Sequence, residues 1–212
     1  MKIAIIGATG FVGSALLKEA AARNHEIVAI TRHPDKVEKL PRVAATKADA
    51  ADVNQLAEAI AGQDVVISAF NGGWGDPDIY NKHLNGSKAI VAAAKRAKVR
   101  LIVVGGAGSL EVSPGHQLVD SPEFPAEWKS GALAARDALD AIREEKELDW
   151  SFVSPAIHLT PGDNTGKYRL GGDQPVFDKQ GESRITVGDL AAAILDEAET
   201  PRHTGKRFTA GY

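Results

Sequence analysis

Three glycines near the start of the chain have the spacing of a turn that can hold a phosphate group. The segment Gly7-Ala8-Thr9-Gly10-Phe11-Val12-Gly13 follows a short apolar run and opens a stretch of helical period. Glycine lets the backbone turn tightly and lets a pyrophosphate approach its amides, and the amino end of a helix adds partial positive charge. A flexible turn is the alternative, but the position between a strand and a helix favours a dinucleotide site. The expected contacts are Gly7, Thr9, Gly10, Phe11 and Val12.

The end of the second apolar run indicates which dinucleotide the turn would hold. NAD-binding proteins present a carboxylate there to the ribose 2′-hydroxyl, whereas NADP-binding proteins present cations to the 2′-phosphate. The sequence reads Ile30-Thr31-Arg32-His33-Pro34-Asp35-Lys36, with Arg32 at the deciding position and Lys36 one helical turn later. A solvated cation beside a helix start is the alternative for Arg32. The pattern favours NADP(H), with NAD(H) as the second choice.

The glycine turn and Arg32 can meet only if a sheet places them at one edge, and the chain has the pattern of such a sheet. Short β-branched runs alternate with longer amphipathic stretches, which is typical of βαβ units. This predicts an α/β protein with a Rossmann-type doubly wound parallel sheet. Strands are expected at residues 2–6, 26–31, 44–48, 64–70, 100–105, 150–154 and, in the tail, 207–209. Helices are expected at residues 11–23, 53–61, 79–97, 126–145 and 185–199, the last led by Asp189.

Two segments rich in Gly, Pro and Asp, at residues 71–78 and 106–125, directly follow predicted strands. Ligands of doubly wound sheets bind at the carboxyl ends of the strands, so both loops are expected to border the site. Residues 155–180 have no helical period. No repeat, low-complexity tract or linker divides the chain. We therefore expect residues 1–212 to form one domain, in which residues 155–212 include a small substrate lobe.

Composition narrows the class of protein. The 212 residues are 43% hydrophobic and 25% charged, as in a globular chain that buries a core. A net charge of -3 without a Lys/Arg cluster argues against a nucleic-acid partner. No stretch approaches the roughly 20 apolar residues of a membrane span, and no signal-peptide pattern is present. The absence of cysteine suits a reducing cytoplasm, so we expect a cytoplasmic protein with a small-molecule substrate and no metal.

The chain resembles the short-chain dehydrogenase/reductase superfamily, because its glycine spacing is that of the extended and atypical branches. Four further stretches resemble small bacterial NmrA-like proteins named NADH-flavin reductases or epimerase/dehydratase-like proteins. These stretches are Val104-Gly105-Gly106-Ala107-Gly108-Ser109-Leu110, Trp150-Ser151-Phe152-Val153-Ser154-Pro155-Ala156, Gly166-Lys167-Tyr168-Arg169 and Gly181-Glu182-Ser183-Arg184-Ile185. The resemblance implies that Asp49 meets the adenine. It further implies that the cofactor is bordered by Ser68, Ala69, Phe70, Gly105 and Pro155.

The resemblance fails at the catalytic pair. The superfamily uses a tyrosine with a lysine four residues later, and neither Tyr80 nor Tyr168 has one, while Tyr212 is the last residue. Glu127-Trp128-Lys129-Ser130 stand where that tyrosine would fall. The resemblance leaves Ser109 and Lys129 as candidates for contact with the substrate or the nicotinamide ribose. A hydroxyl that caps its own backbone and an exposed helix-start cation are the alternatives.

Other polar and aromatic residues in the loops are weaker candidates. A histidine or carboxylate near a nicotinamide could act as acid or base, although exposed loop residues are often only solvated. The candidates are His116, Asp120, Glu123 and His158. Trp74 and Trp128 could line an aromatic pocket or anchor the loops by packing.

Without the Tyr/Lys pair, hydride transfer to a flavin or to a small conjugated carbonyl or quinone is the favoured chemistry. Water can supply the proton, so the protein need only align donor and acceptor. An NAD-dependent epimerase or dehydratase acting on a sugar or small carbonyl is an alternative that needs a positioned base. A non-catalytic NADP(H) redox sensor of the NmrA type is a third. The oligomeric state stays open.

Overall fold

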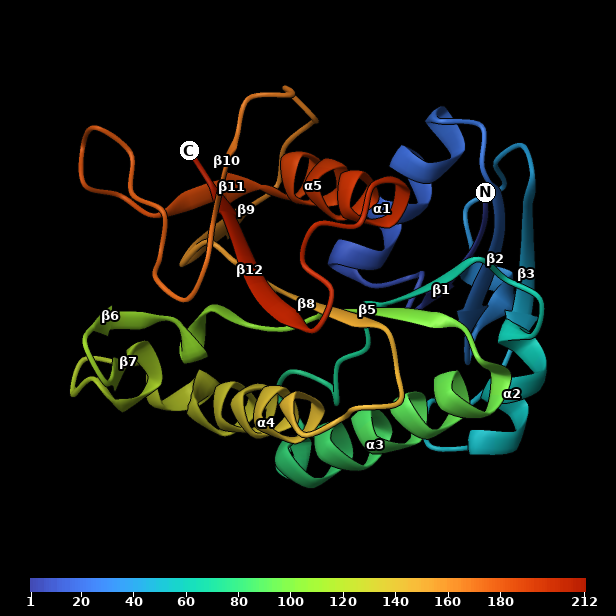
Figure 1. Ribbon diagram of the computed structural model, residues 1–212, viewed down its shortest axis with the longest axis horizontal. Helices are drawn as coiled ribbons and strands as arrows, with labels where there is room; N and C mark the ends of the chain where they lie inside the picture. The colour runs from blue at the N-terminus through green and yellow to red at the C-terminus, as the bar shows by residue number, and fades with distance from the viewer.

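The computed structural model describes all 212 residues, and its central feature is an eight-stranded sheet between two layers of helices (Figure 1). The strand order is β10-β12-β8-β5-β4-β1-β2-β3, in which only β10 runs antiparallel to its neighbour. The predicted Rossmann-type, mostly parallel sheet is confirmed. Its strands are β1 Lys2–Ile6, β2 Glu26–Thr31, β3 Val43–Lys47, β4 Val65–Ser68, β5 Arg100–Val104, β8 Trp150–Pro155, β10 Arg169–Gly171 and β12 Lys206–Gly211.

Helices cover both faces of this sheet. Figure 1 shows α1 and α5 on one face and α2, α3 and α4 on the other. None of these helices has the length together with the apolar character that a membrane span requires. The helices are α1 Phe11–Ala22, α2 Val53–Ile60, α3 Ile79–Ala97, α4 Ala126–Arg143 and α5 Val187–Glu199.

The first strand divides the core in two, because successive side chains of a strand point to opposite faces. Ile3 and Ile5 pack with residues of α1 and α5, whereas Ala4 and Ile6 pack with residues of α2, α3 and α4. All four are buried. The nearly continuous apolar sequence of β1 is therefore the consequence of helices on both of its faces.

The predicted elements exist; half of their ends coincide with the structure, and the other half differ from it by one or two residues. The strands expected at 2–6 and 26–31 and the helix expected at 79–97 are confirmed at both ends. The last helix begins at Val187, and not at residue 185, because Arg184–Thr186 form β11 and the Thr186 hydroxyl accepts a hydrogen bond from the Asp189 amide. Asp189 therefore does not lead the helix. It is completely buried in the first turn.

The segments predicted to lack regular structure contain short strands. Residues 106–125 include the hairpin of β6 Glu111–Ser113 and β7 His116–Gln117. β9 His158–Thr160 pairs in parallel with β11. Strands this short have no room for a period that a sequence can display.

The tail contributes more to the central sheet than the prediction of a strand at 207–209 suggests. β12 lies between β8 and β10 and pairs with β8 over its length. Its apolar pattern is broken by Arg207, which is buried because it pairs with Asp173 at 2.6 Å. The sequence predicts a strand here, but a single arginine gives no sign that its side chain is buried or that the strand lies inside the sheet.

A buried carboxylate braces the amino ends of the strands. Glu197 of α5 is 3% exposed and accepts hydrogen bonds from Arg100 at 2.7 Å and from the Ser151 hydroxyl at 2.9 Å. It also accepts from the backbone N–H groups of Arg202 and His203 and lies 2.7 Å from the ring nitrogen Nδ1 of His203. Burial raises the pKa of Glu197, but the hydrogen bonds outweigh burial and hold that pKa below its ordinary value of 4.5.

Replacing Glu197 by glutamine should lower the free energy of unfolding by about 2 kcal/mol at neutral pH, because charge-assisted hydrogen bonds weaken and an amide donor faces other donors. A carboxyl whose pKa is depressed by folding stabilises the protein above its ordinary pKa and ceases to do so as the pH falls. The variant should therefore lose less stability on acidification than the wild type. Urea unfolding at neutral and acid pH measures both effects. Glu147→Gln is the control, since that carboxylate is 79% exposed, and an equal loss in both variants would contradict the expectation.

Candidate functional site

The carboxyl ends of the parallel strands bring the predicted cofactor residues to one edge of the sheet. Gly7 follows β1, Arg32 follows β2, and Gly105 follows β5. β1 pairs with β2 on one side and with β4 on the other, so the segments that follow β2 and β4 flank the segment that follows β1. This edge is where ligands of doubly wound sheets bind.

The glycine turn is held between the neighbouring strand ends, and its glycines have different roles. Gly7 has φ +78°, and a β-carbon there would lie 2.7 Å from the Ala69 carbonyl oxygen. A β-carbon at Gly13 would lie 2.0 Å from the Gly7 carbonyl oxygen, so this glycine allows α1 to pack on the turn. Gly10 is exposed, and a β-carbon there would meet only the Gly7 oxygen at 3.3 Å. The structure needs Gly7 and Gly13 for its own packing, whereas Gly10 leaves space outside the turn.

The amino end of α1 fits an anion. Gly10 is its N-cap, and no side chain caps the helix. The turn is closed by the Gly10 amide, which donates to the Gly7 carbonyl at 3.0 Å, while the Gly7 amide donates to Ile30 at 3.0 Å. First-turn N–H groups have no partner within a helix and are satisfied by caps, water or ligands. An uncapped helix beside a glycine cradle is therefore suited to the pyrophosphate of a dinucleotide.

The cations predicted to select the cofactor are available. Arg32 and Lys36 are exposed and form no ion pair. The Thr31 hydroxyl fixes the loop that carries Arg32, because it accepts from the His33 amide at 3.2 Å and lies 3.3 Å from the Thr9 hydroxyl. Thr9 thus links the glycine turn to the end of β2, where a 2′-phosphate would be read.

The remaining predicted cofactor residues are mostly tied into local structure. Asp49 is exposed, and its carboxylate accepts from the Ala51 amide at 2.9 Å. Ser68 is buried and accepts from the Phe70 amide at 3.5 Å. Pro155 is buried at the end of β8. Their contacts with adenine or cofactor stay predictions.

Two aromatic rings pack against glycines near the ends of β4 and β5. A β-carbon at Gly86 would lie 2.3 Å from the Phe70 ring, and one at Gly105 would lie 2.1 Å from the Phe152 ring. Phe70 also stacks on the buried ring of His83, with the centroids 5.8 Å apart. Burial lowers the pKa of His83. Sequence reasoning missed His83 and Gly86, because both lie inside an ordinary amphipathic helix pattern.

The two tentative catalytic residues have contrasting environments. Ser109 is 3% exposed, and its hydroxyl accepts a hydrogen bond from Arg207, which also donates to the Ser154 hydroxyl at 3.2 Å. This gives Ser109 a structural partner inside the protein. Lys129 is exposed in the first turn of α4 and forms no ion pair, so its ammonium group is free to meet a ligand.

The weaker loop candidates do not form an acid/base cluster. His116 is on β7, His158 is on β9, and both are exposed. Asp120 is paired with Arg136 at 3.1 Å, and Glu123 is exposed. No group of three histidine or carboxylate side chains has the arrangement of a metal site.

Every tyrosine hydroxyl donates to a carboxylate. Tyr80 donates to Asp137 at 2.5 Å, Tyr212 donates to Asp189 at 2.6 Å, and Tyr168 donates to Asp196. The hydrogen bond to Asp137 raises the pKa of Tyr80, while burial and the bond to Asp196 raise the pKa of Tyr168. These are the opposite of the surroundings that activate a phenol, so the missing Tyr/Lys pair has no substitute among the tyrosines.

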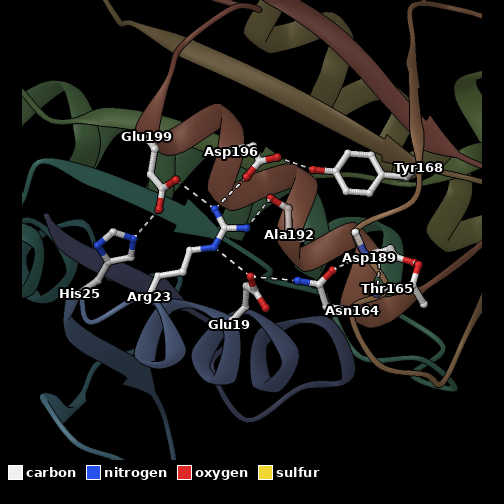
Figure 2. A network of polar contacts seen from close by, with 11 residues as sticks. Glu19, Arg23, His25, Asn164, Thr165, Tyr168, Asp189, Ala192, Asp196 and Glu199 are labelled. Carbon is white, nitrogen blue, oxygen red and sulfur yellow. Dashed lines mark hydrogen bonds and ion pairs between the residues drawn. The ribbon is translucent and has the colours of Figure 1, made fainter.

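A polar network fastens the late segment to the helix that follows the glycine turn (Figure 2). At the end of α1, Arg23 pairs with Glu19, Asp196 and Glu199 at 2.8 to 3.0 Å. Asn164 donates to Glu19 at 3.1 Å. The loop that contains Asn164 is therefore tied to α1 as well as to α5.

Two hollows of the surface lie away from the predicted cofactor site. One, of about 490 Å³, is lined by residues that include Arg143, Lys206 and Arg207. The other, of about 460 Å³, is lined by residues that include Tyr168 and Arg202. Both adjoin β12 near its amino end, at the edge opposite to the glycine turn.

A comparison with known protein families agrees with the dinucleotide site predicted at the glycine turn. The sequence profile described as NAD(P)H-binding matches residues 7–198. The chain belongs to this NAD(P)H-binding family. The predicted nicotinamide dinucleotide cofactor is thereby confirmed.

Three solved structures illustrate what the chain is similar to. The chain is 44% identical to a "putative epimerase" from Bacteroides thetaiotaomicron, with a TM-score of 0.92 over 100% of this chain and 96% of that one. It is 43% identical to a "putative exported protein" from Burkholderia pseudomallei, with a TM-score of 0.88 over 100% of both chains. It is 35% identical to a "putative NADH-flavin reductase" from Streptococcus pneumoniae, with a TM-score of 0.89 over 100% of this chain and 99% of that one. The epimerase and flavin-reductase names agree with the two kinds of protein that the sequence resembles, whereas the name of an exported protein does not.

Proposed function

We propose that the protein is a reductase that binds NADPH and passes hydride to a flavin or to another small conjugated acceptor, such as a quinone or carbonyl. The observation that carries this proposal is the state of the tyrosines, whose hydroxyls all donate to carboxylates. Carbonyl reduction in the usual manner needs a positioned proton donor, whereas a flavin spreads the added charge and takes its proton from water. The name of the similar Streptococcus pneumoniae structure supports the same chemistry.

The bound dinucleotide would supply the hydride and leave as NADP⁺, while the acceptor gains that hydride and one proton from water. The chain's own residues bind the dinucleotide and orient it toward the acceptor. The uncapped start of α1 and the space beside Gly10 suit the pyrophosphate. The exposed cations Arg32 and Lys36 suit the 2′-phosphate. The protein need only hold donor and acceptor in contact.

Steady oxidation of NADPH in the presence of free flavin, followed at 340 nm with a protein-free control, tests this function. Turnover with flavin supports the reductase. Tight NADP(H) binding without turnover of flavins, quinones or small carbonyls would favour a redox sensor. Turnover of a sugar substrate would favour the epimerase alternative, which the name of the Bacteroides thetaiotaomicron structure supports.

Replacing Tyr80 or Tyr168 by phenylalanine should leave NADPH-dependent flavin reduction within about threefold of the wild-type rate. Neither hydroxyl is expected to act as an acid, and the loss of a positioned proton donor typically costs about 10² to 10⁴ in rate. The measurement uses purified protein without bound flavin. A thousandfold loss in either variant would contradict the proposal and indicate chemistry that depends on a phenol.

We also propose that the protein acts in the cytoplasm on a small molecule, and not on nucleic acid or a membrane. A chain without cysteine and with net charge -3 suits a reducing compartment and lacks a basic surface for phosphate backbones. The similar Burkholderia pseudomallei structure carries the name of an exported protein. Fractionation of cells that express the full-length protein decides between the two locations.

A further inference from the structure

Two of the three tryptophans are exposed. Trp74 is 61% exposed and Trp128 is 55% exposed, whereas Trp150 is 3% exposed. Trp74 lies in the loop after β4, and Trp128 lies in the first turn of α4. Tryptophan carries the largest apolar surface of any side chain, so the exposure of two rings at the same end of the sheet marks a contact surface.

The two rings flank the same stretch of α4. A β-carbon at Gly131 would lie 2.7 Å from Cζ3 and 3.0 Å from Cη2 of Trp74, so the Trp74 ring rests on the helix where only glycine leaves room. Gly131 comes three residues after Trp128, and positions i and i+3 share one face of a helix. Trp74 and Trp128 together are called the tryptophan platform below.

The strand order places this platform on the acceptor side of the cofactor. The cations that suit the 2′-phosphate follow β2, which lies on one side of β1, whereas Trp74 and the helix that carries Trp128 follow β4 and β5 on the other side. A dinucleotide in a doubly wound fold crosses the sheet at this reversal of strand order, with its phosphates at the first turn. Its adenosine end is therefore expected toward β2 and its nicotinamide end toward β4 and β5.

We propose that the tryptophan platform binds the hydride acceptor by stacking on its flat conjugated ring system, which is the isoalloxazine ring of a flavin. This inference rests on the proposed function, and it adds the surface that recognises the acceptor. Aromatic rings attract flat conjugated partners in offset-stacked arrangements, beyond the gain from burying apolar area. Such stacking tolerates different substituents, which suits a site that recognises a ring and not a particular tail.

Binding of FMN to the protein saturated with NADP⁺ tests the proposal without any hydride transfer. FMN should quench the fluorescence of the exposed tryptophans, while Trp150 is left as a buried background signal. FMN fluorescence or calorimetry then measures binding to Trp74→Ala, Trp128→Ala and Leu170→Ala. Each tryptophan variant should weaken FMN binding by about tenfold or more, in line with the loss of one stacking partner. Leu170 is 41% exposed on β10, so its variant should bind FMN as the wild type does.

A second variant tests the geometry while keeping both tryptophans. Gly131→Val would force the Trp74 ring away from α4, so it should also weaken FMN binding, with circular dichroism to verify that the variant is folded. FMN binding unchanged in both tryptophan variants would overturn the proposal. If the wild type reduces flavin and the tryptophan variants bind FMN as the wild type does, the proposed reductase function is supported and the tryptophan platform is contradicted. If FMN binding depends on the tryptophans but no flavin is reduced, the tryptophan platform is supported and the proposed reductase function is contradicted.

Discussion

Replacing Gly10 by valine is expected to abolish dinucleotide binding and to leave a folded protein. A β-carbon at Gly10 meets only one protein atom, at 3.3 Å, and the residue is in an extended conformation that valine adopts readily. The side chain would instead fill the space that a pyrophosphate needs beside the start of α1. The exchange of glycine for valine at an N-cap should cost about 1 kcal/mol of stability. Circular dichroism, thermal unfolding and calorimetric titration with NADPH measure both halves of this expectation.

Gly13→Ala is the matched comparison. A β-carbon there would lie 2.0 Å from the Gly7 carbonyl oxygen, so the turn itself must shift. This variant should lose much thermal stability as well as binding, whereas Gly10→Val should lose binding with only the small loss of stability given above. Submicromolar NADPH binding by a folded Gly10→Val protein would show that the pyrophosphate does not lie at this turn.

The parts of the fold that sequence could predict are those that repeat a simple physical pattern. The strand at Lys2–Ile6 is apolar throughout because helices cover both faces, and the helix at Ile79–Ala97 is long enough to display its period. The glycine turn was predictable because two of its glycines answer a backbone requirement that no other residue meets. Gly7 has a left-handed conformation and Gly13 contacts the turn.

The parts that sequence could not predict depend on partners far away in the chain. The strand at 207–209 was predicted, but the burial of Arg207 was not, because its partner Asp173 lies 34 positions earlier in the chain. Ser109 was a candidate for substrate contact because of its position after β5, but its hydroxyl meets Arg207 from β12. The three tyrosine–carboxylate pairs likewise join residues at least 23 positions apart. Such pairings arise from tertiary packing, which local spacing does not encode.

Replacing Arg32 by glutamate should weaken NADPH binding by about a hundredfold or more and change NADH binding little. Arg32 is exposed and forms no ion pair, so its charge is available to a ligand. A charge-assisted contact with a 2′-phosphate contributes about 1.5 to 3 kcal/mol, and a carboxylate in its place adds repulsion. NADH carries a 2′-hydroxyl at that position, and this hydroxyl can donate a hydrogen bond to the carboxylate of the variant. Calorimetric titrations of both dinucleotides give the ratio of variant to wild-type affinity for NADPH and the same ratio for NADH.

Lys39→Glu is the control for a general effect of charge, because Lys39 is an exposed cation without an ion pair in the same loop region. It introduces the same change in net charge farther from the end of β2. A long-range electrostatic effect would weaken NADPH binding in both variants and would shrink as salt is added. A direct contact affects Arg32→Glu alone and separates NADPH from NADH. Equal losses for the two dinucleotides in Arg32→Glu would show that Arg32 does not read the 2′-phosphate, and the preference for NADP(H) would then rest on Lys36 alone.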